Sequence, residues 1–181
     1  MKTFRKIAAL VLALAVLTAL AACGSKTDDT TDTAADAGAA RTLDEIKDSG
    51  EIVIGVFSDK APFGYVDENG DYAGYDVYFA ERLAKDLGVT VKFVSVEPAS
   101  RVEFLKTGKV DVILANFTVT DERAEQVDFC LPYMKVALGV VSPESAPLNS
   151  VDELDGKTII ICKGTTAETY FEANHPEVEL L

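Results

Sequence analysis

The sequence predicts a doubly wound α/β fold, in which helices cover both faces of a mainly parallel sheet. Between residues 42 and 114, continuous apolar runs typical of buried parallel strands alternate with helical patterns. After residue 147 the alternation starts again, with about one further βα unit before residue 181. One such unit cannot enclose a core of its own, so we expect either an incomplete second lobe or elements that pack onto the first domain.

Local signals mark the first elements. Residues 42–45 read Thr-Leu-Asp-Glu, a capping box that opens a short helix ending near Gly50. The apolar run 52–57 predicts a buried strand. From Asp76 the apolar residues recur at helical spacing, and Gly88 stands where a C-terminal cap belongs. These residues therefore predict a helix, a strand and a second helix.

The alternation continues with similar signals. Residues 89–96 predict a strand, Pro98 opens a helix that ends at Gly108, and residues 110–114 predict the next buried strand. The resulting order of strand, helix, strand, helix and strand is typical of a doubly wound domain.

A further set of elements follows a polar stretch that ends at Pro147. Residues 150–153 and 165–168 each read as a capping box, and residues 157–162 predict a strand between them. These are the elements that we expect to begin a second lobe.

The N-terminus carries a targeting signal rather than part of the fold. Residues 1–22 combine basic residues with an apolar stretch too short for a comfortable membrane span, as in a signal peptide. Cys23 follows Leu-Ala-Ala, which looks like a lipobox, so we expect Cys23 to be acylated; the alternative is an ordinary secretory signal with a chance cysteine. Residues 23–41 lack large apolar side chains, so we expect them to form a disordered tether. We expect a lipid-anchored, extracytoplasmic protein.

Composition excludes some partners. The net charge of −13 argues against a nucleic-acid surface and against docking on anionic lipid, because both need clustered Lys and Arg. An extracytoplasmic address permits a disulfide between Cys130 and Cys162. Both cysteines lie in apolar surroundings, however, so we expect them to be small core residues.

Signals for catalysis and for metal binding are weak. His175 is the only histidine, and the chain contains no HExxH, CxxC, P-loop or GxGxxG motif. Residues 67–71 imitate the start of a calcium loop, but Gly70 is at the wrong step and Tyr78 replaces the closing glutamate. We therefore expect no enzyme activity, no metal and no cofactor.

Ligands of open α/β sheets bind beyond the carboxyl ends of the strands. The loop that follows the predicted strand 110–114 contains Asn116, Thr118 and Arg123. Thr120 is a good N-cap, and an arginine on the first helical turn can bind a carboxylate through two N–H groups. The alternative is that Arg123 only pairs with a neighbouring acid, Asp121 or Glu125.

The loop that follows the predicted strand 157–162 contains Thr165 and Thr166, at the capped start of another helix. Two helix N-termini that face each other across a cleft would suit a small zwitterion. The alternative is that these threonines form an ordinary helix cap.

Several motifs resemble family 3 of the bacterial solute-binding proteins, which serve ABC importers of polar amino acids. The resemblance covers roughly residues 43–181. One departure is Tyr78, where an acidic residue is usual. The motifs that carry the resemblance are Gly74-Tyr-Asp-Val-Tyr-Phe-Ala-Glu-Arg-Leu-Ala84, Thr118-Val-Thr-Asp-Glu-Arg123, Val127-Asp-Phe129, Pro132-Tyr133, Leu154-Asp-Gly-Lys157 and Gly164-Thr-Thr166.

The resemblance implies a periplasmic-binding-protein-like fold of type II, with two doubly wound lobes and a cleft that closes on the ligand. Lobe 1 would span residues 42–141, the hinge residues 142–147, and the start of an incomplete lobe 2 residues 148–181. The remainder of lobe 2 and the return to lobe 1 would lie beyond Leu181.

The resemblance also assigns roles in the cleft. Arg123 looks like the residue that holds the α-carboxylate of the ligand. Asn116 and Thr118 look like partners for the carboxylate and the amine. Thr165 and Thr166 look like the residues of the second lobe that bind the ligand carboxylate. The amine-binding aspartate of the family would lie beyond the end of this sequence.

The ligand class follows from further matches. Arg101 resembles an arginine that reaches the ligand side chain in binders of acidic amino acids; the alternative is a solvated helix face. Lys60 and Ala99 stand where many members sandwich a large side chain between aromatic rings. Phe57 stands near an acidic position that pairs with cationic ligands. Longer stretches look most like the cysteine-binding branch.

The resemblance therefore implies binding without catalysis. The chain would be the substrate-binding component of an ABC importer for a polar amino acid, with cysteine favoured, and would deliver that ligand to a membrane permease. The ATPase of the permease would be a further partner. One alternative is a dehydratase-like enzyme of the same fold, and another is the sensor module of a receptor kinase.

Overall fold

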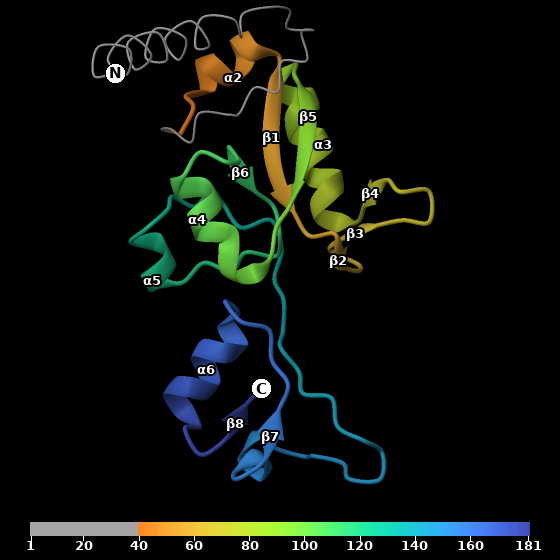
Figure 1. Cartoon of the computed structure of the whole chain (residues 1–181), viewed down its shortest axis with the longest axis vertical. Helices are drawn as coiled ribbons and strands as arrows, with labels where there is room; N and C mark the ends of the chain where they lie inside the picture. The colour runs from red at the N-terminus through yellow and green to blue at the C-terminus, as the bar shows by residue number, and fades with distance from the viewer. Residues whose placement is uncertain (1–39) are drawn as a thin grey trace, which may run out of the picture. The chain divides into compact units, whose positions relative to one another are not determined.

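The computed structural model describes residues 40–181, all within one unit that spans residues 37–181 (Figure 1). The expected signal peptide (1–22), the expected lipidation site Cys23 and almost all of the tether (23–41) lie outside the described residues. Within the described part, no helix combines the length and the apolar character needed to cross a membrane.

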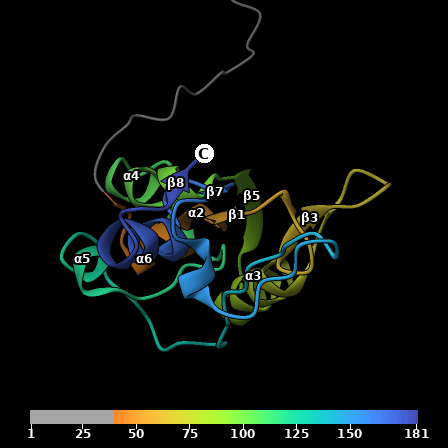
Figure 2. The ribbon, with the colours of Figure 1, turned by 90° about the horizontal axis from the view of Figure 1, so that it is seen from below.

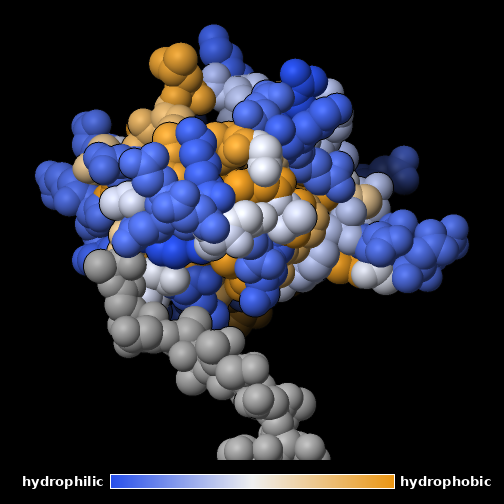
Figure 3. Space-filling model, turned by 90° about the horizontal axis from the view of Figure 1, so that it is seen from above, coloured by the Kyte–Doolittle hydropathy of each residue, from blue (hydrophilic) through white to orange (hydrophobic). Residues whose placement is uncertain are grey.

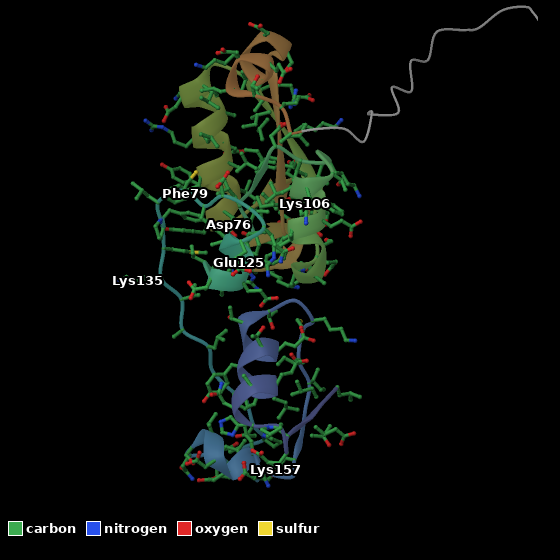
Figure 4. The ribbon with its side chains drawn as sticks, turned by 90° about the vertical axis from the view of Figure 1, so that its left-hand side faces the viewer. Asp76, Phe79, Lys106, Glu125, Lys135 and Lys157 are labelled. Carbon is green, nitrogen blue, oxygen red and sulfur yellow. The ribbon has the colours of Figure 1, made fainter. Side chains whose placement is uncertain are left out.

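The central sheet has three parallel strands in the order β5-β1-β6. Strand β1 (Glu51–Val56) pairs along its whole length with β5 (Thr90–Ser95), and its end pairs with β6 (Val112–Ile113). Helix α3 (Tyr75–Leu87) connects β1 to β5, and the 3₁₀ turn η1 (Pro98–Ser100) with α4 (Arg101–Lys106) connects β5 to β6. Figures 2 and 4 show α3 and α4 on opposite sides of the sheet, which confirms the doubly wound α/β fold.

The predicted caps of the first helices are confirmed. Helix α2 (Leu43–Ser49) begins at a capping box in which Thr42 and Glu45 bond each other's backbone N–H. Gly50 ends the helix at φ 72°, the left-handed conformation that favours glycine at this position. Gly88 ends α3 in the same way, at φ 75°. These ends follow from local chemistry alone.

Two apolar clusters cover the two faces of the sheet. On one face, Ile52, Ile54 and Val56 of β1 pack in a cluster with Val77 and Ala80 of α3. Full burial of such aliphatic side chains stabilises the fold by about 1.5–3 kcal/mol each. The α4 side holds a second cluster of Phe57, Val96, Ala115, Phe104 and Ile113.

An antiparallel hairpin sheet lies beside α3. It consists of β2 (Asp59–Lys60), β3 (Gly64–Val66) and β4 (Tyr72–Ala73). The turn expected at residues 67–70 is present, because the Asp67 carboxylate accepts the backbone N–H groups of Asn69 and Asp71, each at 2.9 Å.

The C-terminal elements are η2 (Val151–Leu154), β7 (Thr158–Ile159), α6 (Thr166–Asn174) and β8 (Glu179–Leu180). Strands β7 and β8 are parallel, and Leu154, Phe171 and Val178 form a small buried cluster. The expectation of a single βα unit is therefore wrong by one strand. The predicted strand 157–162 is also reduced to two residues.

Helix prediction succeeded at one of the two C-terminal capping boxes. Thr165 caps α6, and its hydroxyl accepts the backbone N–H of Glu168. The capping box expected at residues 150–153 is wrong, because the Ser150 side chain makes no cap bond and the segment is a 3₁₀ turn. The Glu153 carboxylate instead accepts the N–H of Asn149 at 3.4 Å, outside the turn.

The core positions expected for Cys130 and Cys162 are wrong, since both are free and exposed. Cys130 follows the short helix α5 (Asp121–Ala124) in a stretch without helix or strand, and Cys162 follows the end of β7. Apolar neighbours in sequence did not bury either thiol, because no second layer of structure covers these stretches among the described residues.

Candidate ligand-binding site

Two arginines from separate helices converge on one backbone oxygen. The Nη2 groups of Arg101, at the start of α4, and Arg123, in α5, both donate to the Gly164 carbonyl at 2.9 Å. The Phe117 ring lies under both guanidinium groups, 4.4 Å from that of Arg101 and 4.9 Å from that of Arg123. The structure thus brings together residues from three predicted ligand-binding segments.

Arg101 is only 3% exposed, so the alternative of a solvated helix face is wrong. Its Nε donates to Pro98 O at 2.9 Å, and its Nη1 donates to Ala115 O at 2.9 Å and to Asn116 O at 3.2 Å. With the bond to Gly164, four of its five N–H groups contact carbonyls of the protein. Arg101 therefore holds several backbone segments together and keeps one N–H for another partner.

Arg123 is half-buried and keeps more of its donors. Its Nη1 donates to Thr118 O at 2.8 Å, and its Nη2 to Gly164 O, so three N–H groups remain for a ligand. Among the described residues, it forms no ion pair with Asp121 or Glu125. The geometry therefore suits a carboxylate better than the alternative of a local salt bridge.

The two guanidinium groups lack an acidic partner within residues 40–181. Burial, helped by the nearby charge of Arg123, lowers the pKa of Arg101 to about 10, so Arg101 stays charged at neutral pH. Burial also lowers the pKa of Arg123. Among the described residues the two cations donate hydrogen bonds only to neutral carbonyls, and the one acid that acts on Arg123 is Glu122, through its charge, so the pair favours an anion.

The threonines lie at the start of α6, next to Gly164. The Thr165 hydroxyl donates to Cys162 O at 2.7 Å and accepts the Glu168 N–H at 3.3 Å, so the helix cap already uses it. Thr166 is the first residue of the helix.

On the other side of the site, Thr118 is exposed, and its carbonyl rather than its hydroxyl contacts Arg123. The Asn116 carbonyl contacts Arg101. The structure therefore brings all six predicted binding residues, Arg101, Asn116, Thr118, Arg123, Thr165 and Thr166, to one region.

Sequence reasoning missed a buried carboxylate beneath this site. Asp76 is fully buried at the start of α3 (Figure 4), and its two oxygens accept the Asn116 N–H at 2.9 Å and the Tyr133 hydroxyl at 2.7 Å. Burial raises the pKa of Asp76, although both hydrogen bonds act in the opposite direction. In the sequence, Asp76 belongs to one of the family motifs, but nothing local shows that it is buried or what it contacts.

Two further features of the described residues are an apolar groove, whose lining includes Asn116 and Thr118 of the candidate site, and a small polar cluster. A groove of about 910 Å³ beside β6 is lined mostly by apolar side chains, and apolar surface also shows on the face seen in Figure 3. In the described part of the chain, Asp155, His175 and Glu177 could together contact a metal ion. His175 Nδ1 already lies 3.4 Å from the Glu177 carboxylate, and both acids are exposed.

Comparisons with known proteins show what this chain is similar to. The sequence pattern of the bacterial extracellular solute-binding proteins, family 3, matches residues 52–178. The crystal structure of a cysteine-binding protein from Campylobacter jejuni superposes with a TM-score of 0.75 at 58% identity, over 77% of this chain and 57% of that chain.

Two curated relatives match at lower identity. A glutamine-binding protein from Geobacillus stearothermophilus is 32% identical over 94% of this chain and 69% of its own length. A cyclohexadienyl dehydratase from Pseudomonas aeruginosa is 29% identical over 99% of this chain and 63% of its own length. The chain thus spans between about half and two thirds of these proteins.

Proposed function

We propose that this chain, which belongs to the bacterial extracellular solute-binding proteins of family 3, binds a small amino acid for an ABC importer. The observation that carries the proposal is the pair of arginines, from α4 and α5, that both contact the Gly164 carbonyl just before α6. Arg101 and Arg123 have no acidic partner among the described residues, and Arg123 keeps three donors for the ligand carboxylate. A bidentate arginine–carboxylate contact is both strong and directional.

Cysteine is the ligand that we favour. The support is the 58% identity to a cysteine-binding protein, well above the 32% identity to a glutamine-binding protein. The charges of the site add to this support, because a cationic ligand side chain would meet two arginines. Lysine, arginine and histidine are therefore disfavoured.

The roles of the remaining residues complete the proposal. Asn116 and Thr118 would contact the carboxylate and the amine, and Thr165 with Thr166 would hold the ligand from the second lobe. Arg101, with one N–H left, would mainly position the carbonyls around it.

The remaining expectations concern the organisation of the whole protein. Residues 42–141 would form lobe 1, residues 142–147 the hinge and residues 148–181 the start of lobe 2. A lipid on Cys23 would anchor the protein at the extracytoplasmic face of the membrane, where a permease that works with its ATPase would receive the ligand.

Isothermal titration tests the proposal. Residues 42–181 are joined to the remaining C-terminal part of the Campylobacter jejuni cysteine-binding protein and titrated with L-cysteine in a reductant, with L-glutamine, and with L-lysine. We expect cysteine to bind most tightly, and Arg123→Ala to weaken it at least ~30-fold, since truncating a desolvated charged contact costs about 2–5 kcal/mol.

Arg82→Ala is the matched control, because Arg82 is exposed and pairs only with Asp86 on the same helix. Tighter binding of lysine than of cysteine would overturn the cysteine preference. Failure of every amino acid to bind would overturn the receptor proposal, and a change below ~3-fold in Arg123→Ala would leave Arg123 a structural role only.

A dehydratase is the second candidate, on the strength of the 29% identical relative. Such an enzyme needs a general acid or base in the cleft. The buried carboxylate of Asp76 lies beneath the site, but both of its oxygens already accept hydrogen bonds. We therefore expect no ultraviolet signal of ring aromatisation when the same chimera is mixed with prephenate, and such a signal would favour the enzyme.

A further inference from the structure

The carboxylate of Asp76 lies where three parts of the chain meet. It belongs to α3, and it accepts hydrogen bonds from Asn116, 40 residues away in the sequence, and from Tyr133, 57 residues away. Asn116 lies in the loop that follows β6. Tyr133 lies in the stretch 125–150, which contains no helix or strand and leads to the C-terminal elements. One side chain thus contacts both the ligand-site loop and this connecting stretch.

The backbone of Asn116 is held at both ends of the residue. Its N–H donates to Asp76, while its carbonyl accepts from Arg101 at 3.2 Å. Its φ of 44° is in the left-handed region, which asparagine adopts more readily than most residues other than glycine but which still costs free energy unless contacts hold it. The Asp76 carboxylate therefore helps to impose the conformation that aims the carbonyls of the loop at the arginines.

Tyr133 is held on α3 by several contacts. Its ring stacks with that of Tyr75 at 6.1 Å and packs against that of Phe79 at 4.9 Å. The Tyr75 hydroxyl donates to Tyr133 O at 3.3 Å, and the Tyr133 hydroxyl donates to Asp76. This anchoring fixes the connecting stretch beside the ligand-site loop.

We propose that Asp76 is a positioning residue that couples the ligand-site loop to the connecting stretch 125–150. The inference rests on the proposed function for its consequence on ligand affinity, but the coupling itself does not. A carboxylate suits this place because it accepts on both oxygens and stands in the first turn of α3, where the helix dipole favours negative charge. Loss of either contact should release the Asn116 backbone.

The two contacts of Asp76 predict how strongly each substitution should reduce the protection of the Asn116 amide from hydrogen exchange. Asp76→Asn keeps both contacts, because its amide oxygen can accept from Asn116 while its NH₂ donates to the Tyr133 oxygen. Asp76→Ala loses both. Tyr133→Phe loses one and leaves a buried oxygen without its donor. Tyr78→Phe is the matched control, since Tyr78 lies on the same helix but is 62% exposed.

Hydrogen exchange measured by NMR on the chain itself tests the coupling without any ligand. We expect exchange of the Asn116 amide to accelerate about tenfold or more in Asp76→Ala, the factor that corresponds to one lost buried hydrogen bond. We also expect acceleration in Tyr133→Phe, although Tyr133 does not contact Asn116. The amide of Ile54 in β1 serves as the reference for global stability.

Exchange at Asn116 that changes no more than at Ile54 in Tyr133→Phe would overturn the proposal, even if Asp76→Ala does not fold. Loss of protection in Asp76→Asn equal to that in Asp76→Ala would overturn it too. In the chimera described above, cysteine affinity should fall about tenfold in Asp76→Ala, and stay within ~3-fold in Asp76→Asn and Tyr78→Phe. If the unsubstituted chimera binds no amino acid, the proposed function fails, while the exchange result still decides the coupling.

Discussion

Replacement of Arg101 by alanine should be among the most damaging single changes in this chain. The side chain makes four hydrogen bonds to carbonyls, and bonds from a charged donor are worth at least about 1.5 kcal/mol each, or about 6 kcal/mol together. Burial, together with the nearby charge of Arg123, lowers the pKa of Arg101 to about 10, which corresponds to a penalty of about 3 kcal/mol for holding the charge at this place. Removing the side chain relieves that penalty, so the net loss should be about 3 kcal/mol.

Urea denaturation followed by far-ultraviolet circular dichroism measures this loss, since the chain contains no tryptophan. Arg101→Lys should lie between wild type and Arg101→Ala, because lysine has three donors on a single nitrogen. The control Arg82→Ala removes an exposed pair with Asp86 and should change the free energy of unfolding by less than about 0.5 kcal/mol. If Arg101→Ala is no less stable than Arg82→Ala, the conclusion that Arg101 stabilises the fold by holding several backbone segments together is refuted.

Three further predictions follow from single contacts. Asp111→Asn should lower the free energy of unfolding by about 1.5–3 kcal/mol, because the buried carboxylate pairs with Arg41 and accepts the Val53 N–H; unchanged urea stability would contradict this. Gly164→Ala should lose about 1 kcal/mol or more, because φ is 75° and the added Cβ would lie 2.5 Å from Ala99 Cα; protease cleavage near residue 164 should rise, and an unchanged pattern would count against it. For Asp76, burial raises the pKa, so the folded state holds the proton more tightly than the unfolded state. Relative to Asp76→Asn, wild type should therefore lose stability as pH rises from about 4 towards the raised pKa, and a difference independent of pH would argue against it.

Features that depend on neighbouring residues along the chain could be predicted from the amino-acid sequence. The capping box at Thr42, the left-handed glycines Gly50 and Gly88, and the Thr165 cap are as predicted, because each needs only a few adjacent residues. The long apolar run that became β1 was equally clear, since a strand buried on both faces has few polar positions. The polar residues that follow two predicted strands, and for Arg101 the family resemblance, indicated the residues of the candidate site.

The burial of side chains and their contacts could be read only from the folded chain. Cys130 and Cys162 have apolar neighbours in sequence but are exposed, whereas Arg101 and Asp76 are polar but buried. Burial of a charged group depends on partners far away in the sequence, and a local pattern does not contain them. The Gly164 carbonyl meets Arg101 across 63 residues, and only the folded chain brings the two together.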